Sequence, residues 1–374
     1  MRIFRILFWF VSAAIVCIVF SYGSTVSWNA SMVTPSQTVV QTPDEKMLEE
    51  IEKLPLEKRV GQLMIFGFAT TTPDEHIKGL IKDYGVGGVN LLKRNVVNAE
   101  QVKSLITTLQ SLTEAEGFPP MFVGVDQEGE VDRFTFLDEH TSQKDITGPT
   151  NAYEVAKKRG KELTSLGVTM NFSPVLDYVP DQKAYLYKRT FATSTETAAA
   201  LGVAMVQGYE AGGVIPVFKH FPGYGKITVD PHKKQATLPQ DMSLEKSLSV
   251  FKSVLASTPD VPIMTAHIIY PEVDVRPATL SKKFLTEMLR DLWGYSGVII
   301  TDDLEMVSVG GEDFREVAVE SLEAGADMLI STYTTSRHEL IIKAIIAAVE
   351  SGRLTERQIN ASVLRVWKLK GKIN

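Results

Sequence analysis

The sequence contains a single cysteine, Cys17, which lies in an apolar segment at the N-terminus. The rest of the chain can form no internal disulfide bond, so cysteine usage gives no indication of the redox compartment. Long basic runs are also missing: 39 Lys and Arg stand against 45 Asp and Glu, a formal net charge of -6. Because phosphate backbones are bound by clustered positive charge, this composition argues against nucleic acid as a partner.

The N-terminus carries an apolar run of residues 6–22, preceded by Arg2 and Arg5. A basic stretch followed by an apolar one is the pattern of an export signal. The run is shorter than the roughly 20 residues that span a membrane, yet long for the core of a cleaved signal. We therefore predict that residues 1–22 are a signal peptide or an uncleaved membrane anchor, and that the protein is exported. Residues 23–44, rich in Ser, Thr, Val and Pro, are predicted to be a linker.

From Leu48 onward, short apolar runs alternate with amphipathic helical stretches. This alternation predicts βαβ units with parallel strands, and no glycine-rich dinucleotide motif opens the first unit. Eight units favour a closed (β/α)8 TIM barrel over an open sheet, so residues 45–374 are predicted to form one catalytic domain. The eight runs are Leu63–Phe68, Gly87–Leu92, Met121–Val125, Val168–Phe172, Gly213–Phe218, Val261–Ala266, Gly297–Thr301 and Asp327–Ile330.

Polar residues follow most of these strands, and catalysis in this fold takes place at the carboxyl ends of the strands. We therefore expect them to meet at one rim of the barrel as an active site. They are Asp126 to Glu130 after the third strand, Asn171, Asp177 and Arg189 near the fourth, Lys219 to Gly225 after the fifth, His267 after the sixth, and Asp302 with Asp303 after the seventh.

Asp302 ends an apolar strand that should be buried. A carboxylate there is costly unless it is paired or functional. The alternative is that Asp302 or Asp303 caps the following helix. Because neighbouring residues of a strand point to opposite faces, only one of the two is expected to enter the barrel mouth.

The segment from Lys219 to His232 is long, polar and punctuated by glycine, and long loops in compact domains are usually either functional or disordered. Asp230 lies two residues before His232, close enough for its carboxylate to orient the imidazole. Histidine, whose pKa in an unstructured peptide is about 6.5, can give and take a proton near neutrality. The alternatives are an ordinary turn at 230–232 and a solvated strand end at Lys219. The acidic residues after the third strand lack a complementary ligand set, so no metal is predicted.

These residues resemble glycoside hydrolase family 3, specifically its single-domain β-N-acetylglucosaminidases, whose motif is K-H-F-P-G-[HD]-G-x4-D-[ST]-H. The chain reads Lys219-His220-Phe221-Pro222-Gly223-Tyr224-Gly225, four residues, then Asp230-Pro231-His232, so only Tyr224 and Pro231 depart. The resemblance extends over roughly residues 46–370, including Asp126-Gln127-Glu128-Gly129 and Thr301-Asp302-Asp303-Leu304.

The resemblance implies a retaining, exo-acting β-N-acetylhexosaminidase that needs no cofactor and removes terminal N-acetylglucosamine from β-linked glycans, such as those derived from peptidoglycan. By the same resemblance, Asp302 is the nucleophile, His232 the general acid/base and Asp230 the residue that orients His232. The positions that hold the carbohydrate substrate are Asp126, Arg133, Arg189, Lys219 and His220.

Two departures from the family pattern carry expectations of their own. After the third strand the family usually reads E-G-G-R-V-x-R, whereas Glu128 to Arg133 is one residue shorter and lacks the first arginine. Pro231 replaces a small hydroxyl residue and restricts the backbone. We therefore expect Asp230 and His232 to be in contact already in the unliganded protein.

Two other functions stay open at this point. One is a β-glucosidase of the same family, against which the histidine-containing loop argues. The other is a non-catalytic, sugar-binding barrel at the cell envelope, against which the presence of both Asp302 and His232 argues. The molecule that accepts the sugar, water or phosphate, also stays open, because a neutral imidazole does not repel phosphate as a carboxylate would.

Overall fold

The computed structural model describes residues 41–239, 242–310 and 313–373. The predicted signal or anchor segment, and the predicted linker up to residue 40, lie outside these ranges. Helix α1 (Pro43–Glu52) is capped by the side chain of Thr42, so it takes in the last two residues of the range predicted as linker. Within the described ranges, no helix is both long and apolar enough to cross a membrane.

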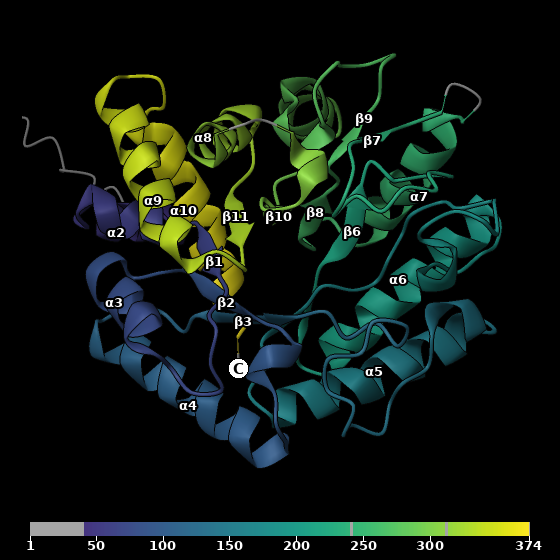
Figure 1. Ribbon diagram of the computed structural model, residues 1–374, viewed down its shortest axis with the longest axis horizontal. Coiled ribbons are helices and arrows are strands. Elements are labelled where there is room, and N and C mark those ends of the chain that lie inside the picture. The colour runs from purple at the N-terminus through teal and green to yellow at the C-terminus, as the bar shows by residue number, and fades with distance from the viewer. Residues whose placement is uncertain (1–40, 240–241, 311–312, 374) are drawn as a thin grey trace, which may run out of the picture. The chain divides into compact units, whose positions relative to one another are not determined.

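Parallel strands form the centre of the domain (Figure 1). Their hydrogen-bonded order is β5-β4-β3-β2-β1-β11-β10-β8-β6. Because only Val217 separates β5 from β6, the two ends of this series meet in the chain, and the sheet closes into the expected (β/α)8 barrel. The strands are β1 (Met64–Phe66), β2 (Gly88–Leu91), β3 (Phe122–Val125), β4 (Met170–Asn171), β5 (Ile215–Pro216), β6 (Phe218–Phe221), β8 (Ile263–Thr265), β10 (Ile299–Asp303) and β11 (Met328–Ser331).

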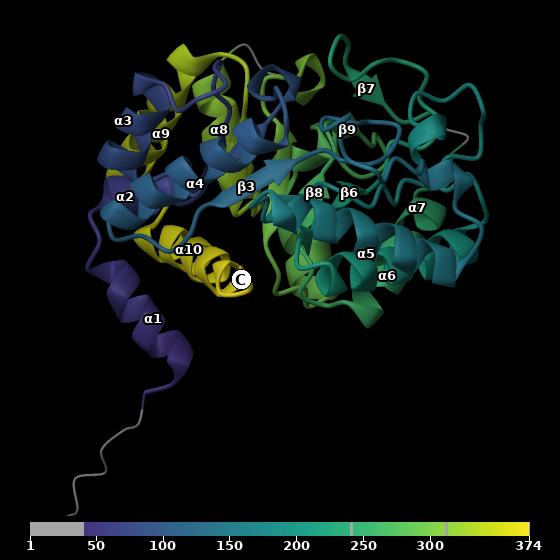
Figure 2. The ribbon, with the colours of Figure 1, turned by 90° about the horizontal axis from the view of Figure 1, so that it is seen from below.

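Helices connect successive strands and surround the barrel, and α5 and α6 lie side by side (Figure 2). A second, two-stranded ladder pairs β7 (Ala236–Thr237) with β9 (Ile268–Ile269). The helices after α1 are α2 (Leu56–Gly61), α3 (Glu75–Tyr84), α4 (Ala99–Ala115), α5 (Pro149–Ser165), α6 (Thr195–Ala211), α7 (Leu244–Ser257), the wider η5 (Lys283–Leu292), α8 (Phe314–Ala324), α9 (Thr335–Glu350) and α10 (Glu356–Lys370).

The fifth strand differs from the prediction. The apolar run Gly213–Phe218 contains two short strands: β5 pairs with β4, and β6 pairs with β8 and continues to Phe221. The N–H groups of Ile215 and Val217 donate to the β4 side, whereas the N–H of Phe218 donates to Pro262 on the β8 side, and Pro216 between them has no N–H to donate. Lys219 and His220 therefore lie within a barrel strand, and the expectation that they follow it, or form a solvated strand end, is wrong.

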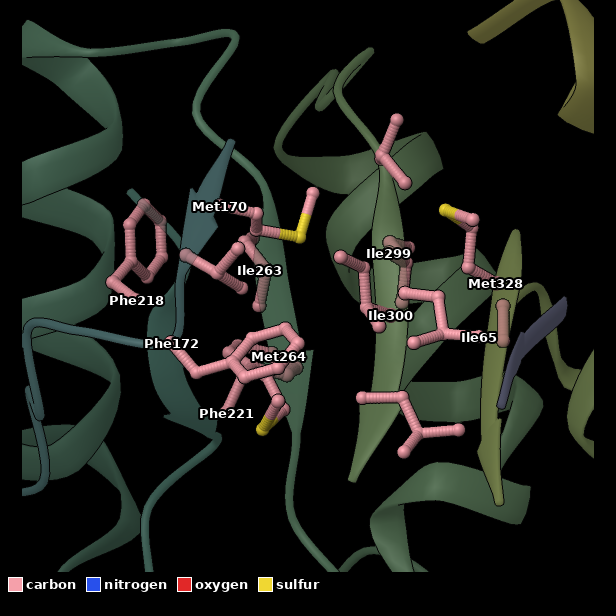
Figure 3. Close-up of a cluster of buried hydrophobic side chains, with 14 of the residues drawn as sticks. Ile65, Met170, Phe172, Phe218, Phe221, Ile263, Met264, Ile299, Ile300 and Met328 are labelled. Carbon is pink, nitrogen blue, oxygen red and sulfur yellow. The ribbon is translucent and has the colours of Figure 1, made fainter. Parts of the chain in front are cut away.

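The strands are buried on both faces, as their continuous apolar sequences predict. Figure 3 draws part of the resulting core, to which strands from both ends of the sequence contribute. Ile65 of β1, Met170 of β4, Ile263 of β8 and Met328 of β11 are all completely buried in it.

Asp327, directly before β11, holds several elements together at the amino-terminal side of the strands. Its side chain is completely buried. Oδ2 accepts hydrogen bonds from Nη2 of Arg290 at 2.5 Å and from the backbone N–H of Ile299 at 2.9 Å. Oδ1 accepts from Oγ of Ser362 at 2.8 Å and from Nε of Arg365 at 2.9 Å. One carboxylate thus joins η5, β10, β11 and α10.

Replacing Asp327 by alanine should strongly destabilise the protein, because it leaves two arginines and a backbone N–H without their acceptor. Removing one partner from a buried charge network typically costs about 3–5 kcal/mol of unfolding free energy. Denaturant or thermal unfolding of Asp327→Ala measures the loss. Asp44→Ala is the control: Asp44 pairs with Lys368 at 2.7 Å, but both side chains are half exposed, so at most about 1 kcal/mol is expected. Similar losses of unfolding free energy in the two variants would contradict the role of Asp327 in holding these elements together.

Candidate active site

A cavity of ≈ 240 Å³ opens where the strands end. It is small for a ligand site, since such pockets are typically about 300–1,000 Å³. Every predicted site residue except Asp230 lines it, so the structure brings together residues that are up to about half the chain apart. Those lining residues are Asp126, Arg133, Arg189, Lys219, His220, His232 and Asp302.

Charged side chains of alternating sign form one wall of the site. Nζ of Lys219, which is 1% exposed, lies 2.6 Å from both Oδ1 of Asp126 and Oε1 of Glu128. Arg189 binds Glu128 with two hydrogen bonds, from Nε at 2.8 Å and from Nη2 at 2.7 Å. At the other end of the series, Nη2 of Arg133 lies 3.7 Å from Asp126.

The pKa values of Glu128, Asp126 and Lys219 are each shifted in the direction that keeps the group charged. Burial by itself would raise the pKa of Glu128, but Arg189 and Lys219 outweigh it and the pKa is lowered. For Asp126, burial is likewise outweighed, here by Lys219 and Arg133, and the pKa is lowered. Burial opposes the charge of Lys219, whose pKa the two carboxylates nevertheless raise. Glu128 was expected at the rim with the other residues after the third strand, but it was not predicted to contact the substrate.

His220 is fixed by Asp177, a buried residue near the end of β4. Oδ2 of Asp177 lies 2.9 Å from Nδ1 of the imidazole and also accepts the backbone N–H of His220 at 2.9 Å. Its Oδ1 accepts the N–H of Tyr224 at 2.6 Å. These bonds hold the ring of His220 in one orientation at the cavity wall.

Asp302 and Asp303, at the end of β10, have different surroundings. Asp303 accepts hydrogen bonds from the N–H of Glu305 at 3.0 Å and from the hydroxyl of Thr332, and burial raises its pKa to about 7. Oδ1 of Asp302 accepts the N–H of Asp303 at 2.8 Å, and none of the described residues donates to its Oδ2. Asp302 therefore keeps one carboxylate oxygen for a ligand.

The alternative that one of this pair caps a helix is wrong, and so is the expectation that only one of them enters the barrel mouth. Neither aspartate caps a helix, because α8 is capped by Asp313 and the short turn that starts at Val307 follows Met306. Both aspartates line the cavity, not one. The register of β10 against β11 shifts between Ile300 and Asp303, and such a bulge interrupts the strict alternation of a strand.

His267 supports the end of β10 and is completely buried. Its Nε2 lies 3.0 Å from the carbonyl oxygen of Asp303, and its Nδ1 lies 2.8 Å from Oγ1 of Thr279. Burial lowers its pKa. The neutral ring is therefore a positioning group behind the site, and not the rim residue that the sequence suggested.

Asp230 and His232 are in contact, as expected. Oδ1 of Asp230 lies 2.9 Å from Nδ1 of His232 and accepts the backbone N–H of His232 at 3.0 Å. Burial would raise the pKa of Asp230, but the bonds from His232 outweigh it and the pKa is lowered. The imidazole is about half exposed (51%), and no residue of the described ranges is hydrogen-bonded to its Nε2, which leaves that nitrogen to a ligand. The carbonyl oxygen of Pro231 accepts the N–H of Ser308 at 3.0 Å, which ties this loop to the segment after β10.

Arg133 reaches the cavity in spite of the shortened loop. Oε1 of Gln127 accepts the backbone N–H groups of Arg133 at 2.9 Å and of Phe134 at 3.1 Å, which fixes the turn. Nε of Arg133 is buried and has no hydrogen-bond partner among the described residues. A buried, unpaired donor in a cavity wall is available to a polar ligand.

Tyr224, one of the residues expected at the rim, lines the cavity together with several residues that were not predicted. Tyr224 is 2% exposed, and its hydroxyl oxygen accepts the backbone N–H of His267 at 3.0 Å. Asn90, Tyr185 and Tyr333 also line the cavity. Asn90 lies inside an apolar run and Tyr185 in an irregular segment, so neither stood out by its pattern.

Known proteins similar to this chain include hexosaminidases. The chain is 32% identical to Beta-hexosaminidase A of Pseudoalteromonas piscicida, an alignment that covers 81% of this chain and 56% of that protein. It is also 32% identical to a Beta-hexosaminidase of Neisseria gonorrhoeae, over 68% of this chain and 74% of the relative. The chain thus spans little more than half the length of the Pseudoalteromonas protein.

Solved structures with the same fold carry related descriptions. A glycoside hydrolase family 3 β-N-acetylglucosaminidase from Paenibacillus sp. superposes with a TM-score of 0.80 at 34% identity, covering 85% of this chain and 62% of that one. A β-N-acetylhexosaminidase from Beutenbergia cavernae superposes with a TM-score of 0.79 at 26% identity, covering 85% of this chain and 99% of that one.

The family model for the N-terminal domain of glycosyl hydrolase family 3 matches residues 55–369. This range includes every strand of the barrel and every residue of the cavity described above. The chain therefore belongs to glycosyl hydrolase family 3.

Proposed function

We propose that the protein is a retaining β-N-acetylhexosaminidase that releases terminal N-acetylglucosamine from β-linked glycans. The observation that carries the proposal is that one cavity contains both an aspartate with a free carboxylate oxygen, Asp302, and a histidine already paired with a carboxylate, His232. The descriptions of the similar proteins support the sugar.

In the first step of the proposed reaction, Oδ2 of Asp302 attacks the anomeric carbon while His232 protonates the departing glycosidic oxygen from Nε2. The bond to the leaving group breaks, and the sugar is held as an ester of Asp302. In the second step, His232 removes a proton from a water molecule, which attacks the same carbon and frees Asp302. Two displacements at one carbon retain its β configuration.

Asp230 and the charged wall have supporting roles in this mechanism. The carboxylate of Asp230, 2.9 Å from Nδ1 of His232, holds the imidazole in one orientation and leaves Nε2 to exchange the proton with the substrate. Asp126, Arg133, Arg189, Lys219 and His220 offer donors and acceptors for the hydroxyl and acetamido groups of the sugar. Because these groups are already fixed by one another, little ordering is required when the sugar binds.

The proposal extends to location. If residues 1–22 direct export, as a signal peptide or as an anchor, the barrel works outside the cytoplasm. Glycans derived from peptidoglycan are the β-linked source of N-acetylglucosamine that we propose for it there.

Replacement of Asp302 by alanine should remove nearly all turnover, since no other group can form the glycosyl-enzyme. Asp44→Ala, far from the cavity, should retain wild-type turnover.

In the wild type, proton NMR of early hydrolysate should show the β-anomer of the released sugar first. Initial formation of the α-anomer would rule out double displacement.

Replacement of His232 by alanine should reduce kcat by roughly 10²–10⁴-fold, the usual contribution of general acid/base catalysis. The loss should be smaller for a nitrophenyl glycoside than for an alkyl glycoside, because a nitrophenolate departs with little protonation. Parallel kinetics on the two substrates test this. Losses of equal size would exclude His232 as the acid.

Substrate preference separates the proposal from its alternatives. The wild-type protein should have a higher kcat/KM on 4-nitrophenyl N-acetyl-β-D-glucosaminide than on the β-D-glucoside with the same leaving group. The opposite order would identify a β-glucosidase. Binding of the sugar without turnover of either substrate would identify a non-catalytic barrel.

A further inference from the structure

The floor of the cavity is a single layer of the barrel interior. Such interiors are filled by layers of four side chains contributed by alternate strands. Asn90 of β2, Phe172 directly after β4, Met264 of β8 and Ile330 of β11 all line the cavity. These strands are the second, fourth, sixth and eighth around the barrel. Figure 3 draws Phe172 and Met264 within the buried core.

Asn90 is the polar member of this otherwise apolar layer. Its side chain is 5% exposed, and its Oδ1 is buried with no hydrogen-bond partner among the described residues. An unpaired buried polar group destabilises a fold, and asparagine is unfavourable in a strand. A leucine or valine would fill the layer without this cost, so packing does not account for Asn90.

The neighbouring strands have no side chain with which to pair Asn90. In β3 the residue opposite is Gly124, where a Cβ would come within 2.8 Å of the ring of Phe172. In β1, Phe66 pairs with Val89, and the next residue is Gly67. The amide of Asn90 therefore has only apolar atoms and glycine backbone beside it in the neighbouring strands, and its remaining side borders the cavity.

We propose that Asn90 is a specificity-determining residue that hydrogen-bonds a hydroxyl or amide group of the sugar in the cavity; this rests on the proposed function only in that the cavity takes a sugar. The amide offers two donors and an acceptor, and no partner fixes the orientation of its Oδ1. A polar group of the sugar loses its hydrogen bond to water when it reaches the floor of the cavity. A hydrogen bond to the amide of Asn90 replaces it. A sugar without a polar group at this point leaves the amide unpaired and binds less well.

Replacing Asn90 by leucine, which is similar in size, tests the inference through two opposite effects. The dissociation constant of N-acetylglucosamine, measured by calorimetry, should rise about tenfold, and kcat/KM on its nitrophenyl β-glycoside should fall about as much. The melting temperature should be unchanged or higher, because an unpaired amide is replaced by an apolar group. A lower melting temperature with unchanged binding and kinetics would overturn the inference, since a structural asparagine gives that result.

Sugar discrimination gives a second readout. The loss of kcat/KM in Asn90→Leu should differ among the N-acetylglucosaminide, the N-acetylgalactosaminide and the glucoside with one leaving group, because only sugars that place a polar group on the floor lose a contact. Equal losses on all three would overturn the specificity role. Asn90→Ala, which adds no bulk, must show the same unequal losses, and it replaces the leucine variant if that variant does not fold.

Asn360→Leu is the matched control. Asn360 is a buried asparagine of α10, outside the cavity, and its Oδ1 accepts a hydrogen bond from Nη1 of Arg59 at 2.7 Å. Its replacement should lower the melting temperature and leave kcat/KM unchanged. Wild-type protein that neither binds nor cleaves any of the sugars would refute the proposed function. If the wild-type protein is active and the Asn90 variants have the same sugar binding and kcat/KM as the wild type, this inference alone is refuted.

Discussion

The ammonium group of Lys219 is almost completely buried, and a buried charge is tolerated only when it is neutralised in good geometry. Two carboxylates from the loop after β3 neutralise it, and one of these is shared with Arg189 from the long connection between β4 and α6. Because each charge depends on the next, the wall does not form in parts. The wall is complete only when β6, the loop after β3 and the Arg189 segment are all in place, so the site depends on the closed barrel.

A similar arrangement occurs at the opposite side of the strands. Asp327 is a single buried carboxylate that two arginines share, as Lys219 is a single buried ammonium that two carboxylates share. The difference lies in what surrounds them. Both carboxylate oxygens of Asp327 accept hydrogen bonds from the protein itself. The wall around Lys219 instead faces a cavity, and it includes Arg133, whose Nε has no partner among the described residues. This contrast fits the general division of this fold into a stabilising and a reactive face.

Local patterns predicted the barrel and the place of the cavity, through apolar runs of strand length, helical periodicity, and polar residues directly after the strands. The resemblance to family 3 added Arg133 and the role expected of each residue. Other features depend on tertiary contacts that no local pattern contains. The division of the fifth strand follows from a change of pairing partner at Pro216, and the presence of both aspartates in the cavity lining accompanies a register shift in β10. From the sequence, Asn90 was treated as part of an apolar strand. Only the closed barrel shows that its polar side chain lies in an interior layer that borders the cavity.

The loop that carries His232 is attached to the segment after β10 at two points. The carbonyl oxygen of Pro231 accepts the N–H of Ser308, and Nε2 of Gln235 donates to the carbonyl oxygen of Ser308 at 2.8 Å. The two segments consequently behave as one module, although about 70 residues separate them in the chain. Moving the loop that carries His232 into another barrel of this family would therefore require residues 306–310 as well, because the loop otherwise loses its hydrogen bonds to Ser308.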